Sequence, residues 1–391
     1  MAKKKLRIGI LFGGRSGEHE VSLLSAASIL QAIDRTRYDV LPIAIDKQGH
    51  WHTGDRALGL LGSNPLLSPT PGRAPAIASS AHSSTLQINS TADLAQPANP
   101  LSASLDVIFP VLHGTFGEDG TIQGLFELAD IAYVGSGVLG SSASMDKDAM
   151  KRLFTSASLP QTPYLTLLRT DWRADPKRSI KLIEKSLAYP LFVKPANLGS
   201  SVGISKVHTR AELAPALDLA SSFDRKLVIE QGVGGPGAKP RELEVAVLGN
   251  DSPTASVVGE IVPNKEFYDY ESKYQSTDDN PSIPIIPAAL TASQVKQIQT
   301  MALAAFRACD CAGLARVDFL MEPTHDTRGR KIKSPRIFLN EVNTLPGFTQ
   351  FSMYPKLWQA TGLPYKKLID RLITLALERH AEKQQTRFTK P

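Results

Sequence analysis

Two short segments in the second half of the chain carry polar side chains at alternating positions. Arg316 and Asp318 are two residues apart in a strand-like stretch, and Glu341 and Asn343 have the same spacing in another. Side chains alternate between the two faces of a strand, so the members of each pair share a face. If the two strands pair, an Asp, a Glu and an Asn converge as oxygen ligands suited to Mg²⁺ or Mn²⁺. Arg316 would then be a fixed cation for developing negative charge. Two exposed strand faces with ordinary charges would show the same spacing, so this pattern alone leaves both interpretations open.

A second segment combines a lysine with a Gly/Ser loop. Lys194 ends an apolar stretch, and the following residues 195–203 contain Gly199, Ser200 and Ser201 in succession. Such a loop can turn backbone N–H groups and hydroxyls toward phosphate oxygens. It is not a Walker A loop, because the lysine precedes the glycines. A plain Gly/Ser hairpin remains the alternative.

A third segment, residues 113–121, begins with His113 and contains Glu118 and Asp119 among glycines. It follows an apolar strand, and active-site loops of α/β sheets gather at the carboxyl ends of strands. Taken alone, the segment could equally be a turn that caps a helix.

The elements that would position these segments follow from hydrophobic periodicity. The first part of the chain reads as strand, glycine turn, amphipathic helix and strand over residues 6–12, 13–17, 21–33 and 38–45, with a further strand at 105–112. Residues 66–104 are rich in Ser, Pro, Ala and Thr and lack aromatic residues, so we expect a surface insertion. This pattern predicts an α/β domain of Rossmann-like type.

The rest of the chain shows β-type alternation with few crossover helices, which favours antiparallel sheets and an α+β arrangement. We expect helices at 146–156, 212–220 and 292–309, and strands at 191–194, 202–207, 226–230, 242–248, 256–262, 316–321 and 336–342.

Composition excludes several classes of protein. The 391 residues allow two or three domains, and 42% apolar with 21% charged residues is typical of a globular protein. No apolar run approaches the roughly 20 residues that cross a bilayer, and the apolar stretch after the basic start is too short for a signal peptide, so we expect a cytoplasmic protein without membrane contact. The net charge of +6 comes from scattered Lys and Arg, which argues against nucleic acid as a partner. Cys309 and Cys311 have neither the number nor the spacing of a metal site, and we expect two buried thiols.

Together the segments resemble the D-alanine–D-alanine ligase family. The matching motifs occur in one order over nearly the whole chain, at residues 13–22, 113–121, 145–147, 194–203, 268–274, 316–318 and 340–347. The resemblance implies an N-terminal pre-ATP-grasp domain that is followed in the sequence by an ATP-grasp fold. It divides the chain into an N-terminal α/β domain (1–140), a central lobe (141–240) and a C-terminal lobe (241–391) that holds the metal site and a lid (264–287).

The resemblance implies ATP and two Mg²⁺ (or Mn²⁺) ions as cofactors. Asp318, Glu341 and Asn343 would hold the metals. Six further residues would bind the nucleotide: Lys147 and Lys194 at the phosphates, Glu230, Gln231 and Val233 at the adenine, and Glu242 at the ribose. The link at 232–241 is longer and richer in Gly and Pro than expected for the family, which puts the adenine contacts in question.

The implied reaction joins two D-alanine molecules through a D-alanyl phosphate, for peptidoglycan precursor synthesis. Glu18 would bind the ammonium of the first substrate, and Lys273 and Ser352 the carboxylate of the second. Arg316 and the N–H of Gly347 would stabilise the oxyanion. The remaining roles would fall to Ser200 and Tyr274, which link to Glu18 and close the lid, and to His113, which either handles the amine proton or orients Glu18.

Two other functions stay open at this point. A D-alanine–D-lactate ligase, or another ATP-grasp carboxylate–amine ligase, would share the ATP and metal residues. A nucleotide-binding module without turnover would not need Asp318, Glu341 and Arg316 together. The resemblance also suggests a homodimer.

Overall fold

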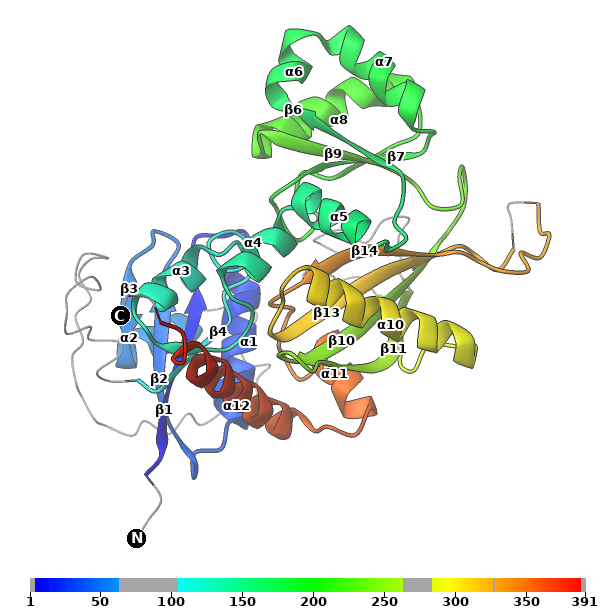
Figure 1. The fold of residues 1–391 in the computed structure, drawn as a ribbon. Helices are drawn as coiled ribbons and strands as arrows, with labels where there is room; N and C mark the ends of the chain where they lie inside the picture. Colours follow the sequence, from blue (N-terminus) through cyan, green and yellow to red (C-terminus); the bar gives the residue numbers. More distant parts are fainter. Residues whose placement is uncertain (1–3, 63–104, 263–282, 326–327, 388–391) are drawn as a thin grey trace. The chain divides into compact units, whose positions relative to one another are not determined.

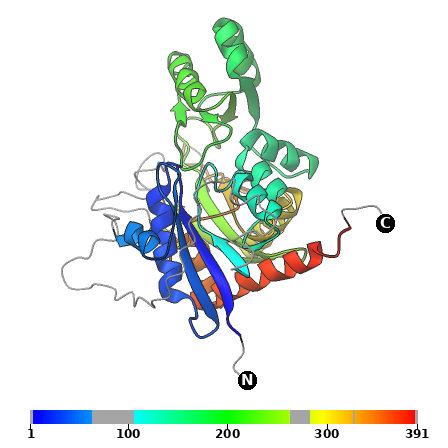
Figure 2. The ribbon, with the colours of Figure 1, turned by 90° about the vertical axis from the view of Figure 1, so that its left-hand side faces the viewer.

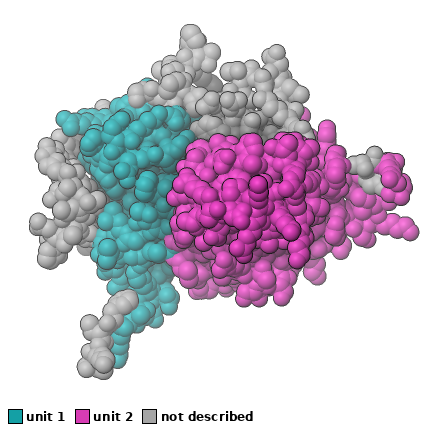
Figure 3. Space-filling view, turned by 90° about the horizontal axis from the view of Figure 1, so that it is seen from above, with its two compact units in different colours: residues 1–138, 345–391 teal, residues 139–344 magenta. Residues whose placement is uncertain are grey.

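The computed structural model describes residues 4–62, 105–262, 283–325 and 328–387. The chain forms two compact units: residues 1–138 with 345–391 (unit 1), and residues 139–344 (unit 2), which Figure 3 shows in different colours. Residues 345–391 thus pack with the N-terminal part, whereas the expected division placed them in a C-terminal lobe. The expected insertion at 66–104, and most of the expected lid with Lys273 and Tyr274, lie outside the described residues.

Unit 1 is built on a five-stranded sheet in the order β3-β2-β1-β4-β5. The strands β1, β2, β4 and β5 pair in parallel, and β3 is antiparallel to β2. The central strand has six consecutive buried residues, as expected of a parallel strand covered on both faces. The strands are β1 (Leu6–Gly13), β2 (Tyr38–Ile45), β3 (Trp51–Thr53), β4 (Val107–Pro110) and β5 (Ala132–Tyr133).

The helices of unit 1 come from both ends of the chain (Figure 1). They are α1 (His19–Ala32), α2 (Gly54–Gly62), α3 (Thr121–Leu128), α11 (Met353–Ala360) and α12 (Tyr365–Lys383). The C-terminal helix α12 packs on β4 and β5, beside the sheet in Figures 1 and 2. Leu368, Ile369, Leu372 and Ile373 of α12 are fully buried. Burial of each stabilises the unit by about 1.5–3 kcal/mol, which is why residues 345–391 belong here.

Unit 2 contains a four-stranded antiparallel sheet in the order β6-β9-β7-β8. Its strands are β6 (Tyr164–Leu168), β7 (Leu191–Pro195), β8 (Ser205–Val207) and β9 (Lys226–Gln231), and its helices are α6 (Arg169–Ala174), α7 (Pro176–Ser186) and α8 (Arg210–Phe223). Apolar residues of these elements, among them Leu191, Val193 and Ile229, form one core. The helices α4 (Val138–Met145) and α5 (Lys147–Ser156) precede this sheet in the sequence.

Unit 2 also contains a five-stranded antiparallel sheet in the order β12-β11-β10-β13-β14. The strands are β10 (Arg241–Gly249), β11 (Thr254–Val262), β12 (Ile283–Ile285), β13 (Gly313–Met321) and β14 (Ile337–Asn343), and α10 (Ala292–Ala308) packs against them. Val317 and Phe319 of β13 point into the core with α10, and Asp318 between them lies on the other face. The sheet therefore has one apolar face and one polar face.

The expected strands and helices are confirmed with shifts of a few residues at their ends. The parallel sheet in the first part and the antiparallel sheets in the second are confirmed as well. Cys309 and Cys311 are buried free thiols, as expected. Within the described ranges, no helix has the length and apolar character needed to cross a membrane.

Candidate active site

The polar face of the β10-β13-β14 sheet carries the expected metal-binding residues. In the antiparallel pairing of β13 with β14, Asp318 lies opposite Glu341 and Arg316 lies opposite Asn343. Cross-strand partners share a face, as do residues two apart on one strand. All four side chains therefore lie on the same face, and the pairing of the two strands that this expectation required is confirmed.

The strand register changes directly beside this group. Asp318 pairs with Glu341 but Phe319 pairs with Leu339, so Asn340 is an extra residue in β14. A β-bulge of this kind twists a strand locally and re-aims its side chains. It lets Leu339 face the core while Glu341 and Asn343 face the polar side.

Arg316 is held by two carboxylates on this face. Its Nε and Nη2 donate to Oδ1 and Oδ2 of Asp318, each at 2.7 Å, and its Nε lies 3.3 Å from Oε2 of Glu244 on β10. Burial alone would lower the pKa of Arg316, but the charges of Asp318, Glu244 and Glu341 raise it well above its ordinary value. The guanidinium is a permanent cation in a fixed orientation, as the stabilisation of an oxyanion requires.

The donor atoms on this face fit a hard divalent cation. Two carboxylates and one carboxamide supply oxygen ligands, and a carboxylate bound by an arginine keeps lone pairs for a metal. In the part of the chain that the structure describes, no three His, Cys, Asp or Glu side chains form a ready metal cluster. The third ligand expected from the sequence is an Asn, and Mg²⁺ bound in this way takes its remaining ligands from water and substrate phosphate.

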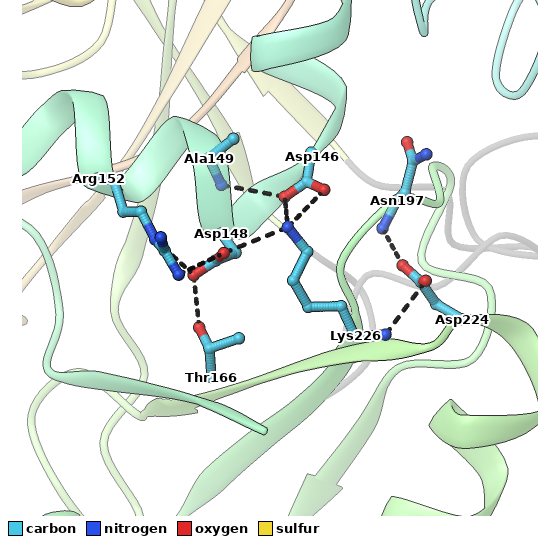
Figure 4. A network of polar contacts seen from close by, with 8 residues as sticks. All are labelled: Asp146, Asp148, Ala149, Arg152, Thr166, Asn197, Asp224 and Lys226. Atoms are coloured by element: carbon cyan, nitrogen blue, oxygen red, sulfur yellow. Dashed lines mark hydrogen bonds and ion pairs between the residues drawn. The ribbon is translucent and has the colours of Figure 1, made fainter. Parts of the chain in front are cut away.

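Lys147 lies at the first residue of α5, where a network of polar contacts anchors the helix (Figure 4). Asp146 caps the helix by accepting from the N–H of Ala149 at 3.0 Å. Lys226 of β9 donates to Oδ1 of Asp146 at 2.8 Å and to Oδ2 of Asp148 at 3.2 Å. The two residues on either side of Lys147 are therefore tied to the same lysine.

The Gly/Ser loop between β7 and β8 is joined to the same helix end. The N–H of Lys147 donates to the carbonyl of Ala196 at 2.9 Å, and its Nζ donates to the carbonyl of Leu198 at 2.8 Å. Ser200 and Ser201 have φ of 51° and 61°. Left-handed conformations in consecutive non-glycine residues are costly and concentrate at functional sites, and they suit a loop that presents N–H groups to an anion.

A buried charge cluster lies at the end of β9. Nζ of Lys194 and Nζ of Lys151 lie 3.1 Å and 3.4 Å from Oε1 of Glu230. Burial alone would raise the pKa of Glu230, but Lys151 and Lys194 outweigh it and lower the pKa to about 2. The two lysines therefore hold the Glu230 side chain in place through one of its carboxylate oxygens.

The other residues expected near the nucleotide come from the end of β9, the link that follows it, and β10 of the five-stranded sheet. Gln231 accepts from the N–H of Ala188 through its side chain at 3.0 Å, and Val233 is buried. Glu242 pairs with Leu320 across β10 and β13, which places it on the polar face with Asp318. The structure thus brings Glu242 to the face of the expected metal ligands.

In unit 1, Glu18 lies at the amino end of α1 against the histidine loop. Its N–H donates to Oγ of Ser16 at 3.2 Å, and that hydroxyl donates to the carbonyl of His113 at 2.6 Å. A Cβ on Gly114 would lie 2.5 Å from Oε2 of Glu18, and Gly114 has φ of 74°. Only glycine meets both conditions, so the glycine after His113 lets the carboxylate approach this loop.

His113 and Glu118 form a buried pair close to Glu18. Nδ1 of His113 lies 3.9 Å from Oε1 of Glu118. Burial and the charge of Glu18 raise the pKa of Glu118 to about 7, against the opposing contact with His113. Burial alone would lower the pKa of His113, but Glu118 and Glu18 outweigh it and raise the pKa above its ordinary value.

Gly347 and Ser352 lie on the segment that follows β14, in unit 1. Oγ of Ser352 accepts from the N–H of Thr349 at 3.1 Å and lies 2.9 Å from its hydroxyl. A Cβ on Gly347 would come within 3.3 Å of that Oγ. The two expected substrate-binding groups therefore share one turn, while Lys273 and Tyr274 lie outside the described residues.

Sequence reasoning assigned no individual role to three buried polar residues, Lys151, Glu118 and Ser25. Lys151 could have been found from its position one helical turn after Lys147, and Glu118 from its position within the histidine loop. Ser25 had no such signal, because a serine inside a helix is ordinarily an exposed or neutral residue.

Comparison with known proteins decides the family. A model described as "D-ala D-ala ligase N-terminus" matches residues 7–136, and one described as "D-ala D-ala ligase C-terminus" matches residues 153–374. The chain belongs to the D-alanine–D-alanine ligase family. The resemblance and the ATP-grasp architecture expected from the sequence are thereby confirmed.

Curated members of the family match this chain over nearly its full length. The chain is 49% identical over 381 residues to a D-alanine–D-alanine ligase of Heliobacterium modesticaldum, covering 97% of each protein. It is 47% identical over 385 residues to one of Bacillus cytotoxicus, covering 98% of this chain and 99% of that protein.

Solved structures of ligases are also similar to this chain. The D-alanine–D-alanine ligase of Coxiella burnetii matches with a TM-score of 0.74 and 34% identity, covering 98% of this chain and 97% of that one. A D-Ala:D-Ser ligase of Enterococcus faecalis matches with a TM-score of 0.74 and 32% identity, covering 95% and 100%.

Proposed function

We propose that this chain joins two D-alanine molecules into D-alanyl-D-alanine, with cleavage of ATP to ADP and phosphate, for peptidoglycan precursor synthesis. Family membership supports the reaction. The observation that carries it furthest is the single polar face on which Arg316, Asp318 and Glu341 meet. In phosphoryl transfer, charge on the phosphate oxygens must be neutralised. A fixed cation beside two carboxylates that can bind metal ions suits this requirement.

ATP binding is assigned to unit 2. Lys147 and Lys194 bind phosphate oxygens together with the N–H groups of the loop around Ser200. The connection from Glu230 through Gln231 to Val233 contacts adenine through its backbone, and Glu242 binds the ribose. The supporting observations are the anchored start of α5 and the left-handed loop residues.

Two Mg²⁺ (or Mn²⁺) ions are assigned to Asp318, Glu341 and Asn343. These ions would neutralise charge on the ATP phosphates and so favour in-line transfer of the γ-phosphoryl group. The protein's own part is to hold the three oxygen donors on one face, for which the pairing of β13 with β14 is the support.

The chemistry has two steps. The carboxylate of the first D-alanine attacks the γ-phosphorus of ATP, and ADP leaves, which produces D-alanyl phosphate. The amine of the second D-alanine loses a proton and attacks the acyl carbon, phosphate leaves, and the amide bond forms. Arg316 and the N–H of Gly347 stabilise the oxyanion of the second step.

Substrate binding is assigned from the family resemblance. Glu18 binds the ammonium of the first D-alanine, and Ser352 with Lys273 binds the carboxylate of the second. Ser200 and Tyr274 link to Glu18. The position of the Glu18 carboxylate against Gly114 and the turn that holds Ser352 support these roles. The family resemblance also supports a homodimer, which light scattering tests. It supports a location in the cytoplasm, which cell fractionation tests.

The decisive test is product analysis. The protein is incubated with ATP, Mg²⁺ and D-alanine, then with D-alanine plus an equal amount of D-lactate or D-serine, and products are resolved by mass. We expect ADP formation that depends on D-alanine, with D-alanyl-D-alanine as the main product in every mixture. A majority of the mixed product would reassign the second substrate, and ADP formation indifferent to D-amino acids would refute the ligase.

A further inference from the structure

The backbone on both sides of Gly347 is held by two buried side chains of unit 1. Nδ1 of His113 lies 2.8 Å from the carbonyl oxygen of Leu345, and the N–H of Phe348 donates to Oγ of Ser25 at 3.2 Å. Oγ of Ser25 lies 3.1 Å from Nε2 of His113. The three contacts close a ring that runs from His113 through residues 345–348 to Ser25 and back to His113.

The hydrogens in this ring can be assigned. A carbonyl oxygen only accepts, so Nδ1 of His113 carries a hydrogen. In the neutral imidazole Nε2 is then the acceptor and the hydroxyl of Ser25 donates to it, whereas in the protonated imidazole, which the raised pKa of His113 favours, Nε2 donates to Oγ of Ser25, so the contact is kept in both states. The lone pairs of Ser25 Oγ remain for the N–H of Phe348. Ser25 and His113 are almost completely buried, and this assignment satisfies the polar atoms that the ring contains.

The ring brackets the peptide that carries the N–H of Gly347. His113 holds the peptide before it, between Leu345 and Pro346, and Ser25 holds the peptide after it, between Gly347 and Phe348. The ring of Pro346 restricts its own φ to about −65°. Glycine is the most flexible residue, so the direction of the Gly347 N–H has to be set by its neighbours.

We propose that Ser25 and His113 act as one unit, here called the Ser25–His113 clasp, that positions the N–H of Gly347 for the oxyanion. The inference rests on the proposed function, in which that N–H stabilises developing charge. It makes His113 a positioning residue of the 345–348 backbone, in place of either role expected from the sequence.

Other contacts anchor the segment without the clasp. The centroid of the Phe348 ring lies 5.7 Å from the ring centroid of Phe109, 5.9 Å from that of Tyr354 and 5.5 Å from that of Tyr365. The hydroxyl of Tyr365 donates to the carbonyl of Phe348 at 2.7 Å. These contacts keep Phe348 in place when Ser25 is changed, so loss of the clasp should alter the direction of nearby peptides more than the fold.

The test is a double-mutant cycle between Ser25→Ala and His113→Asn. Asparagine can still donate to the carbonyl of Leu345 but has no atom where Nε2 contacts Ser25. Each single variant should lower kcat about 10- to 100-fold with the KM for ATP within about twofold, because a displaced oxyanion donor acts only in the transition state. The double variant should be no more than about threefold slower than the worse single variant, because both changes break one ring.

Ser22→Ala is the matched control. Ser22 lies one turn earlier on α1, is equally buried, and accepts from the N–H of Gly13 while donating to the carbonyl of Val111. Its effect on kcat, of whatever size, should multiply with that of His113→Asn. Multiplicative effects of Ser25→Ala and His113→Asn would overturn the clasp, as would a Ser25→Ala enzyme with kcat within twofold of the original.

Hydrogen exchange gives a readout that does not depend on activity. The amides of residues 345–350 should exchange faster in Ser25→Ala than in Ser22→Ala, in the protein without substrates. Unchanged exchange in Ser25→Ala would also overturn the clasp. If the original protein forms no dipeptide, the proposed function fails, and the exchange experiment still decides whether the clasp holds this backbone.

Discussion

Asp318 and Glu341 are direct cross-strand partners in β13 and β14, and the bulge at Asn340 begins at the next residue pair. Two carboxylates opposite each other repel in the absence of cations, and opposed like charges destabilise a sheet. Arg316 offsets part of this repulsion by binding both oxygens of Asp318. The protein's own cation, Arg316, therefore neutralises only part of the negative charge of Asp318 and Glu341.

Glu341→Ala should abolish dipeptide formation and leave the fold intact. The change removes a proposed metal ligand and also one of two repelling carboxylates, so the free energy of unfolding should fall by no more than about 1 kcal/mol. Steady-state kinetics over a Mg²⁺ titration and thermal unfolding measure the two effects. A variant with full activity at ordinary Mg²⁺ would refute the metal assignment.

Asp318→Ala should also abolish turnover but should cost more stability. It breaks the bidentate contact with Arg316 and leaves that buried guanidinium with Glu244 as its partner in the sheet. We expect a loss of about 2–3 kcal/mol in the free energy of unfolding, because an ion is left partly uncompensated. Chemical denaturation of the two alanine variants side by side tests the difference, and equal stabilities would contradict the account of Arg316.

Lys226→Met should weaken ATP binding. Lys226 ties Asp146 and Asp148 together on either side of Lys147, with its side chain only 16% exposed (Figure 4). Without it the start of α5 loses an anchor, and we expect the Kd for ATP to rise several-fold with a stability loss of about 1–3 kcal/mol. Calorimetric titration with ATP and thermal unfolding are the measurements.

Arg152→Met is the matched control for Lys226→Met, because Arg152 contacts the same Asp148. Its side chain is 71% exposed, and exposed ion pairs contribute little to stability. The ATP affinity of this variant should stay within about twofold of the original. Equal effects of the two substitutions would mean that Asp148 alone, and not the link from β9, sets the position of Lys147.

Lys151→Met should destabilise the protein most near pH 7 and make its stability fall less steeply as the pH is lowered from about 4.5. It leaves Glu230 with Lys194 as its remaining lysine, and breaking a buried pair costs about 3–5 kcal/mol. The pKa of Glu230 is lowered to about 2, so its ionised form contributes stability that is present above the unfolded pKa near 4.5 and is lost as the pH falls toward 2. Losing Lys151 should shrink this contribution. Unfolding curves from pH 3 to pH 7, with exposed Lys185→Met as control, test both effects.

Glu118→Gln should stabilise the protein more at pH 8 than at pH 5. The pKa of Glu118 is raised to about 7 in the folded protein, so the native state binds more protons than the unfolded state between about pH 4.5 and 7. Its contribution to stability is therefore present at low pH and is lost as the pH rises through about 7, by up to about 3 kcal/mol. The glutamine imitates the protonated acid at every pH. A difference in unfolding free energy between variant and original that does not grow from pH 5 to pH 8 would contradict the assignment.

Much of the architecture could be predicted from the sequence because it depends on local patterns. The alternation at Arg316 and Asp318, and at Glu341 and Asn343, already shows which residues share a face of each strand. The glycine turn after β1 and the apolar runs of the parallel strands depend on backbone preferences of a few neighbouring residues. Several motifs in one order were enough to indicate the family, since their spacing is a property of the chain alone.

The partners of buried polar residues were decided only by the tertiary structure. Lys151 and Ser25 are residue types that usually face water, and nothing near them in the sequence names Glu230 or the N–H of Phe348 as their partners. The alignment of Asp318 with Glu341 depends on one extra residue at Asn340, which alternation alone does not reveal. Burial and pKa depend on which distant segments the fold brings within a few ångströms, and that follows from the packing of the whole chain.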